Sequence, residues 1–369
     1  MRDERLADRL LHWFARHKRD LPWRREPRDP YRVWLAEVML QQTQATTVVP
    51  YYERWLERFP TLEALAAAPL DAVLKMWEGL GYYARARNLH AAARAVVQTH
   101  DGRIPETVEA LLALPGIGRY TAGAIASLAF NADAPALDGN IKRVLSRVHG
   151  LSAPKEDELW RLAESLLPPG RAGAFNEALM DLGATVCTPR APRCPACPLR
   201  ALCAAQASGD PEAYPARSNR KATPHHEVVT AVVVDERGRV LIGQRPPDGL
   251  LGGLWEFISS ELRPSRGGED TSGGRSSALL ERMIVARTGL RIGRAEVTLL
   301  GEVRHAFTHF RITRHAWLVR LATGRRATTL QAKGYSHLLW ASPAELEGLA
   351  LARSDQKIWQ MCRDRLTAP

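Results

Sequence analysis

The 369-residue sequence has few cysteines and no long apolar run. Five cysteines are too few for a disulfide-rich scaffold. No segment approaches the roughly 20 consecutive apolar residues that span a bilayer. The first residues mix charges into a helical periodicity, whereas a signal peptide carries an uninterrupted apolar stretch. We therefore expect a soluble cytoplasmic protein that does not associate with membranes.

Acidic residues are in the minority, because 51 Lys and Arg stand against 40 Asp and Glu, for a formal net charge of +11. A surplus of this size favours polyanionic partners such as nucleic acid, although diffuse basicity also occurs in proteins that bind none. The hydrophobic fraction of 45% excludes a wholly disordered chain. The length predicts about two domains, each with its own core.

The periodicity of apolar residues changes along the chain. Residues 1–205 place them at steps of three and four, punctuated by Pro and Gly, which predicts an all-α domain. Residues 206–226 are polar and contain proline, which is the composition of a linker. Residues 227–369 combine β-branched runs with helical stretches at 278–287 and 355–366, which predicts an α+β domain.

Four of the five cysteines lie close together, at Cys187, Cys194, Cys197 and Cys203, with the spacing C-x6-C-x2-C-x5-C. Zinc fingers pair two short knuckles across a longer gap. One short spacing flanked by two intermediate ones suits four thiolates wrapped around a compact cluster better. The sequence therefore predicts one [4Fe–4S] cluster. Cys362 stands alone and is expected to be an inert residue in a terminal helix.

Three further features could carry chemistry. Gly116 and Gly118, in the segment LPGIG, allow a tight turn between two helices and leave amide N–H groups free for a phosphate, although many helix connections contain glycine. Asp138 opens a predicted helix over 141–148, where its simplest role is that of N-cap. Glu37 is the only charged residue in the helical stretch 33–40. If it is not exposed, these apolar surroundings should raise its pKa.

In this order and spacing, LPGIG, the downstream Asp and the four cysteines resemble the helix-hairpin-helix DNA glycosylases of the endonuclease III superfamily. Residues 21–44, 78–90 and 175–188 are similar to one branch, the adenine DNA glycosylases of the MutY type. The resemblance implies a monofunctional repair enzyme that flips adenine out of double-stranded DNA and hydrolyses its N-glycosidic bond. It implies adenine mispaired with 8-oxoguanine or guanine as substrate, and a monomer that is nucleoid-associated if the source is bacterial.

The resemblance assigns the chemistry to two carboxyl groups. Glu37 would protonate N7 of adenine and then help to activate water, and Asp138 would stabilise the sugar cation or capture it covalently. Asn140 would assist the water or the carboxylate. Bifunctional relatives carry a Schiff-base lysine where this chain has Tyr120. A phenol forms no imine, so strand cleavage is not expected, and Tyr120 is expected to hydrogen-bond Asp138 or the intermediate.

By the same resemblance, other residues grip the strands and fill the space that the flipped base leaves. Gln42 and Tyr82 would intercalate between bases. The base pocket would be lined by Trp23, Arg24 and Glu177. The remaining DNA contacts are expected from Gln41, Leu80, Gly81, Gly116 and Gly118, while Arg85 and Arg87 are expected to face phosphate or solvent.

The C-terminal domain resembles a Nudix fold, with residues 249–257 as a landmark. A Nudix pyrophosphohydrolase holds Mg²⁺ with the acids of an R-E-x-x-E-E helix, and residues 282–290 contain none of these acids. The resemblance therefore implies recognition of 8-oxoguanine rather than hydrolysis. Phe307 would intercalate, and Thr308 and His309 would hydrogen-bond the oxidised base, although many relatives carry Ser in place of Thr308.

Two alternative functions stay open at this point. One is an endonuclease III-like glycosylase and lyase for oxidised pyrimidines, against which Tyr120 and the second domain argue. The other is a non-enzymatic mismatch-binding protein or iron–sulfur redox sensor, in which Glu37 and Asp138 would be structural.

Overall fold

The computed structural model describes residues 2–216, 223–262, 273–322 and 329–367. The chain forms two compact units. The helical unit comprises Met1–Ala68 and Asn88–Arg220, and the sheet unit comprises Pro69–Arg87 and Lys221–Pro369. Among the helices in the described ranges, none combines the length and the apolar character that crossing a bilayer requires.

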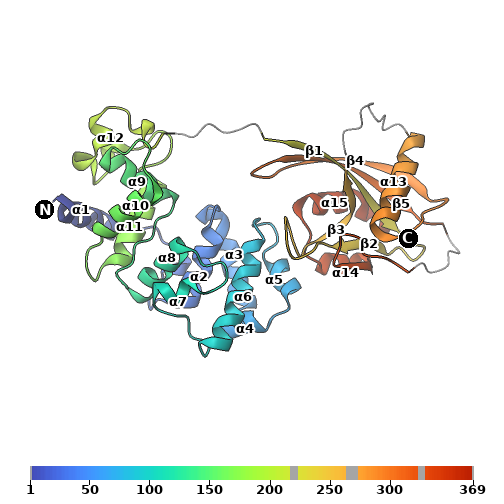
Figure 1. Ribbon diagram of the computed structural model, residues 1–369, viewed down its shortest axis with the longest axis horizontal. Coiled ribbons are helices and arrows are strands. Elements are labelled where there is room, and N and C mark those ends of the chain that lie inside the picture. The colour runs from blue at the N-terminus through green and yellow to red at the C-terminus, as the bar shows by residue number, and fades with distance from the viewer. Residues whose placement is uncertain (1, 217–222, 263–272, 323–328, 368–369) are drawn as a thin grey trace. The chain divides into compact units, whose positions relative to one another are not determined.

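The helical unit is a set of short helices joined by turns, as the apolar spacing predicts (Figure 1). Its described residues form no strand. Of the predicted linker, residues 217–222 lie outside the described ranges. The elements are α1 (Arg2–His17), η1 (Pro22–Arg24), α2 (Pro30–Leu40), α3 (Ala45–Arg58), α4 (Leu62–Ala67), α6 (Ala84–Thr99, which begins in the sheet unit), α7 (Val108–Leu112), α8 (Arg119–Phe130), α9 (Gly139–His149), α10 (Glu156–Ser165), α11 (Ala172–Thr185), η2 (Cys194–Ala196), η3 (Arg200–Leu202), α12 (Ala204–Ala207) and η4 (Pro211–Ala213).

Helix α11 is the central helix of this unit, and nearly all of its residues are buried. A Cβ at Gly173 would lie 2.4 Å from the carbonyl oxygen of Ser127 on α8. A Cβ at Gly183 would lie 2.6 Å from the Cβ of Asn140 on α9. Any larger residue at these two glycines would push the helices apart. The close packing of α8, α9 and α11 therefore fixes where α9 begins, and with it the position of Asp138.

The sheet unit contains a mixed sheet with the strand order β4-β5-β1-β3-β2-β6. Strands β1 and β5 pair in parallel, and the other neighbouring pairs are antiparallel. The elements are α5 (Leu70–Met76), β1 (His225–Val234), β2 (Val240–Gln244), β3 (Trp255–Glu261), α13 (Gly273–Thr288), β4 (Glu296–Ala306), β5 (Arg311–Arg320), β6 (His337–Ala341), α14 (Pro343–Gly348) and α15 (Arg353–Thr367).

Helices α13 and α15 cover opposite faces of the sheet (Figure 1). Successive side chains of a strand point to opposite faces, and β1 follows this rule. Val229, Ala231 and Val233 join the core beneath α13, whereas Val232 and Val234 join the core beneath α15. A helical unit without a strand among its described residues, followed by a mixed sheet with helices on both faces, confirms the predicted order of an all-α domain and an α+β domain.

Candidate functional site

Glu37 lies near the end of α2 and is only 4% exposed. The helix begins at an N-cap, Asp29, whose side chain accepts from the backbone N–H groups of Tyr31 and Arg32. Burial raises the pKa of Glu37 to about 7, and the hydrogen bond from Tyr120 opposes part of this rise. The expectation from the apolar helix is confirmed, since Glu37 keeps its proton close to neutral pH.

Tyr120 reaches Glu37 from α8, which packs against α2. Its phenolic O–H donates to Oε2 of Glu37. Of the two partners expected for Tyr120, Asp138 is not the one that it bonds here, because the packing of α2 on α8 brings the phenol to Glu37, and a contact with the reaction intermediate stays a prediction. The pKa of Tyr120 is raised by burial and by the charge of Glu37, so Tyr120 acts as a proton donor in this bond.

Asp138 is the N-cap of α9 and is half-buried. Its Oδ1 accepts from the backbone N–H of Ile141 at 2.7 Å, and its Oδ2 accepts from Nδ2 of Asn140 at 2.9 Å. Burial raises the pKa of Asp138, and these hydrogen bonds lower it by a smaller amount. The charge of Asp138 in turn helps to raise the pKa of Glu37. The capping role and a second carboxyl role are therefore compatible.

Arg143, which the sequence reasoning missed, links this region to the first cysteine. Its Nη2 donates to Oδ1 of Asn140 at 2.8 Å and to the carbonyl of Gly183 at 2.8 Å, and its Nε donates to the carbonyl of Cys187 at 2.8 Å. Arg143 follows Asn140 by three residues on α9, which is the spacing at which helical side chains meet. That spacing could have indicated from the sequence that Arg143 contacts Asn140.

The four clustered cysteines surround one cavity of the helical unit. Cys187, Cys194, Cys197 and Cys203 line it together with apolar side chains from α9 and α11. Nη1 of Arg147 donates to Sγ of Cys187 at 3.3 Å. In the described ranges, no group of three or more His, Cys, Asp or Glu is arranged to hold a metal ion. Four soft thiol ligands around a shared apolar cavity fit the chemistry of an iron–sulfur cluster.

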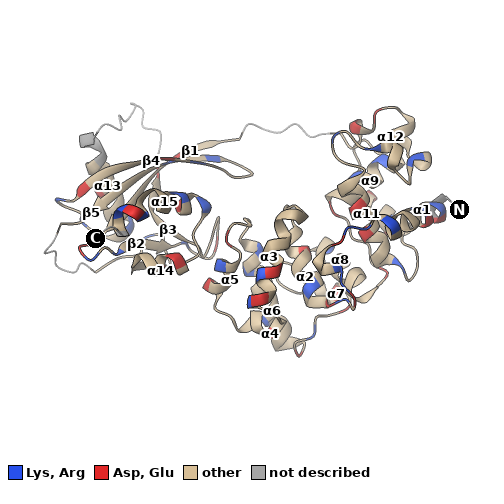
Figure 2. Cartoon of the chain, turned by 180° about the vertical axis from the view of Figure 1, so that it is seen from behind, with Lys and Arg blue, Asp and Glu red and all other residues tan. Residues whose placement is uncertain are grey.

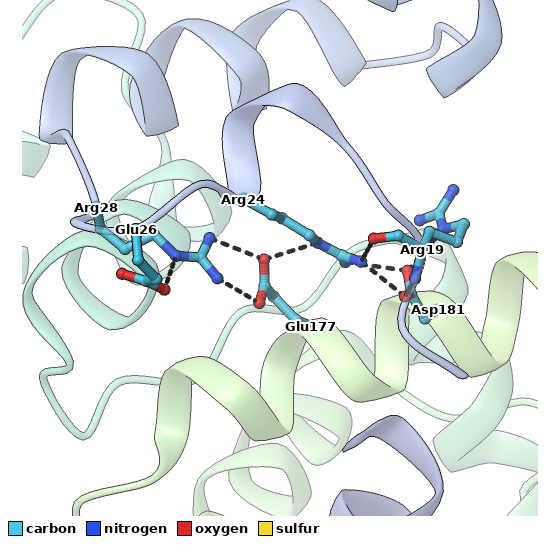
Figure 3. A network of polar contacts seen from close by, with 6 residues as sticks. All are labelled: Arg19, Arg24, Glu26, Arg28, Glu177 and Asp181. Atoms are coloured by element: carbon cyan, nitrogen blue, oxygen red, sulfur yellow. Dashed lines mark hydrogen bonds and ion pairs between the residues drawn. The ribbon is translucent and has the colours of Figure 1, made fainter. Parts of the chain in front are cut away.

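The three residues expected in the base pocket belong to one part of the helical unit. Trp23 is buried and contacts Tyr52 edge to face, with ring centroids 5.3 Å apart. Nε of Arg24 donates to Oε1 of Glu177 at 2.9 Å. Figure 3 shows that Arg24 lies between two carboxylates of α11, Glu177 and Asp181. Asp181, Arg19 and Arg28 complete this network and were missed, although Glu177 and Asp181 have helical spacing.

The expected DNA contacts of the helical unit lie at helix ends. Gln41 ends α2, and its Nε2 donates to Oγ1 of Thr121 at 3.2 Å. Gln42 has a φ of 58°, a left-handed conformation that is uncommon for residues other than glycine and clusters at functional sites. Gly116 has a φ of 74°, and a Cβ there would lie 2.4 Å from Cβ of Asn88. Gly118 precedes α8, and open space surrounds its missing Cβ.

In the sheet unit, Leu80, Gly81 and Tyr82 form a strained turn before α6. Gly81 and Tyr82 have φ angles of 73° and 48°, and Tyr82 is 42% exposed. Arg85 is buried, stacks on Trp77 and donates to the carbonyls of Leu80 and Gly81. The expectation that it faces phosphate or solvent is therefore wrong, because its guanidinium holds the turn. Arg87 likewise donates to the carbonyl of Gly252 at 2.7 Å.

The turn between β4 and β5 carries the residues expected to recognise 8-oxoguanine. The Phe307 N–H donates to the carbonyl of Phe310 at 2.8 Å, and their rings stack with centroids 4.5 Å apart. Thr308 and His309 are exposed at the tip. The hydroxyls of Tyr82 and Thr308 lie within hydrogen-bond distance. Lys and Arg occur in both units, interspersed with Asp and Glu (Figure 2).

Comparisons with known proteins bear on both units. Residues 35–169 match the family model of the HhH-GPD superfamily of base excision DNA repair proteins, and residues 229–361 match a NUDIX domain. The chain is 33% identical to a thermostable thymine-DNA glycosylase of known structure, with a TM-score of 0.53, covering 56% of this chain and 97% of that one. The match supports the helical fold.

Relatives named adenine DNA glycosylase extend over both units. The protein from Rattus norvegicus is 36% identical over 95% of this chain and 77% of its own length. The protein from Homo sapiens is 36% identical over 95% of this chain and 73% of its own length. The fold, the two family matches and these relatives together show that the chain belongs to the adenine DNA glycosylase family of base excision repair enzymes, which act on DNA.

Proposed function

We propose that the enzyme removes adenine mispaired with 8-oxoguanine, and adenine mispaired with guanine, by hydrolysing the N-glycosidic bond in double-stranded DNA. The observation that carries the proposal is a buried acid, Glu37, whose pKa is raised by burial and by the charge of a half-buried acid, Asp138, in a protein of this family. Glu37, with a pKa of about 7, can give up a proton at physiological pH. Asp138 is held by the N–H of Ile141 and by Asn140.

The proposed reaction begins with protonation of N7 of the flipped adenine by the Glu37 carboxyl. The C1′–N9 bond then breaks, and its electron pair leaves with the base. The deoxyribose becomes an oxocarbenium-like cation, which the Asp138 carboxylate stabilises. The Glu37 carboxylate takes a proton from a water molecule as that water adds to C1′, so Glu37 ends the cycle protonated.

We propose that the enzyme cleaves no DNA strand. A lyase forms an imine with a lysine, and the corresponding residue here is Tyr120, whose hydroxyl is engaged with Glu37. This argues against the endonuclease III-like alternative. Glu37 likewise argues against a purely structural role, because buried carboxyl groups with a raised pKa cluster at functional sites.

We also propose that Cys187, Cys194, Cys197 and Cys203 hold one [4Fe–4S] cluster. The shared cavity and the Arg147 contact to Cys187 support this assignment. When bound, such a cluster would brace the loop that follows α11. For the sheet unit, we propose that Phe307, Thr308 and His309 read 8-oxoguanine. The exposure of the last two and the missing acids in residues 282–290 favour recognition over hydrolysis.

The test is adenine release from duplexes that contain an 8-oxoguanine·adenine or a guanine·adenine mispair. Wild-type protein should release adenine from both, and Glu37→Gln should lower the single-turnover rate by at least about a thousandfold while duplex binding persists, because an amide cannot donate the proton. Glu164→Gln, at an exposed position of α10, is the matched control and should leave the rate unchanged. Absence of adenine release by wild-type protein, or a borohydride-trapped covalent complex, would refute the proposal.

A further inference from the structure

The network in Figure 3 joins three arginines to two buried carboxylates. Glu177 and Asp181 lie one turn apart on α11, and Arg19, Arg24 and Arg28 come from the segment between α1 and α2. Glu177 and Asp181 are 5% and 0% exposed, and Glu177 is one of the residues proposed to contact the flipped adenine. The number of donors on each carboxylate therefore determines what the base can contact.

Arg24 is fixed from both sides. Its Nη1 and Nη2 donate to Asp181 at 2.8 and 3.0 Å, its Nη1 also donates to the Arg19 carbonyl at 3.1 Å, and its Nε donates to Glu177. Burial acts to raise the pKa of Asp181, but the bonds from Arg24 and Arg19 outweigh burial, and the pKa lies below its ordinary value. Moving Arg24 would leave the Asp181 charge buried with one partner fewer, which is costly. Arg24 is therefore a positioning residue for Glu177.

Arg28 is held far less firmly. Its Nη1 and Nη2 donate to Oε1 and Oε2 of Glu177 at 3.1 and 2.9 Å, and its Nε donates to Glu26 at 2.8 Å. The Arg28 side chain is 20% exposed, against 9% for Arg24, and Glu26 is 71% exposed. The ion pair with the exposed Glu26 contributes little to holding Arg28. Arg24 cannot leave Glu177 without also breaking its bonds to Asp181, whereas the partly exposed Arg28 can move toward solvent if another donor takes its place on the buried Glu177.

Glu177 accepts three N–H donors, two on Oε1 and one on Oε2, out of about four acceptor positions on a carboxylate. Arg28 supplies two of the three. Adenine carries a 6-amino group, and protonation at N7 spreads positive charge onto that group through the conjugated ring. Replacing Arg28 by the amino group would exchange one cationic donor for another beside the same carboxylate, so the charge balance of the pocket is kept.

We propose that Arg28 holds Glu177 in the free enzyme and is exchanged for the 6-amino group of the flipped adenine, so that Arg28 competes with the base and limits how strongly the site favours a base carrying this group. The inference rests on the proposed function and adds a residue that sets its base specificity. A base without the amino group leaves Arg28 in place and gains nothing from Glu177. Selectivity then depends on how strongly Arg28 competes for the carboxylate.

The experiment compares single-turnover release of adenine and of unsubstituted purine, each opposite 8-oxoguanine, by wild-type protein and by Arg28→Ala. In the variant, adenine can bond Glu177 without first displacing the Arg28 guanidinium. Purine has no amino group, so Glu177 keeps only the donor from Arg24 when purine is bound. The adenine-to-purine rate ratio should therefore rise about tenfold or more over the wild-type ratio, the size of effect expected for a hydrogen bond to a charged group. The intrinsic lability of the two bases cancels in this comparison.

Three further variants make the result decisive. Arg28→Lys keeps the positive charge but cannot make the bidentate contact with Glu177, so it should give an intermediate adenine-to-purine ratio. In Glu177→Gln, the effect of Arg28→Ala on the ratio should vanish, because the shared partner has been changed. Arg25→Ala removes a cation from an exposed position of the same loop and should leave the ratio at its wild-type value.

The outcomes separate the two proposals. If wild-type protein releases adenine but Arg28→Ala and Arg28→Lys leave the ratio unchanged or lower it, the exchange is refuted and the proposed function stands. Equal losses on both bases would make Arg28 merely structural. If wild-type protein releases no adenine, the proposed function fails, and this inference fails with it.

Discussion

At the scale of single residues, the site combines groups whose charge states are set by their surroundings. Burial raises the pKa of Glu37 because it disfavours the ionised form, and Tyr120 stabilises that form by donating a hydrogen bond. A general acid works best when its pKa is near the working pH. The two opposing contributions place Glu37 in that range.

Replacing Tyr120 by phenylalanine tests this balance. The hydroxyl lowers the pKa of Glu37, so its removal should raise that pKa by about one unit, which corresponds to one hydrogen bond to a charged group. Adenine excision should fall as the pH rises through about 7 in wild-type protein, and the fall should lie at higher pH in Tyr120→Phe. A pH series of single-turnover rates measures the shift, with Tyr51→Phe on α3 as control. A fall at unchanged or lower pH would contradict the assignment.

At the scale of elements, the loop after α11 contains little regular secondary structure. Between Thr185 and α12 it contains two short 3₁₀ turns, η2 and η3. Arg147 ties it to α9 by donating to the carbonyls of Thr188 and Pro189. These bonds, together with that of Arg143 to the Cys187 carbonyl, help this loop to keep one conformation.

The cluster proposal predicts that purified protein absorbs visible light and contains about four iron atoms per chain. Cys197→Ser should lose most of both and unfold at a lower temperature, since a bound cluster stabilises the fold that holds it. Iron analysis and thermal unfolding measure these effects. Cys362→Ser, in the core of the sheet unit, is the control and should keep its iron. A colourless wild-type protein with bound zinc would contradict the assignment.

The elements themselves could largely be predicted from the sequence, because they depend on local patterns. The helices of residues 1–205, the strands after residue 227 and the cap at Asp138 all follow from spacing over a few residues. The pairings that sequence reasoning missed join distant segments. Tyr120 and Glu37 are 83 residues apart, and Arg28 and Glu177 are 149 apart. Such contacts depend on how helices pack, which periodicity does not reveal.

At the scale of the whole molecule, catalysis and lesion recognition are proposed for different units. The acids that would break the bond belong to the helical unit, whereas Phe307, Thr308 and His309 belong to the sheet unit. Tyr82, an expected intercalating residue, also belongs to the sheet unit, together with the rest of Pro69–Arg87. Its hydroxyl lies within hydrogen-bond distance of that of Thr308. Base removal and checking of the opposite base should therefore be separable by mutation.

Replacing His309 by alanine should reduce the preference for the 8-oxoguanine mispair by about tenfold, because one hydrogen-bonding side chain at an exposed tip is lost. Excision from the guanine·adenine mispair should change much less. The ratio of the two rates is the measurement, and His337→Ala, an exposed histidine on β6, is the control. Equal losses on both mispairs would argue against a role in recognition.

The burial of Glu37 also has a thermodynamic consequence for the folded chain. Its pKa is raised on folding from 4.5 to about 7, so the native state binds a proton that the unfolded state has already released. This contribution to stability is complete below about pH 4.5 and is lost as the pH rises through about 7. Asp181, with its lowered pKa, acts in the opposite direction and favours the fold once it is ionised. The group proposed to start catalysis thus weakens the fold most in the alkaline range, where it has lost the proton it is meant to deliver.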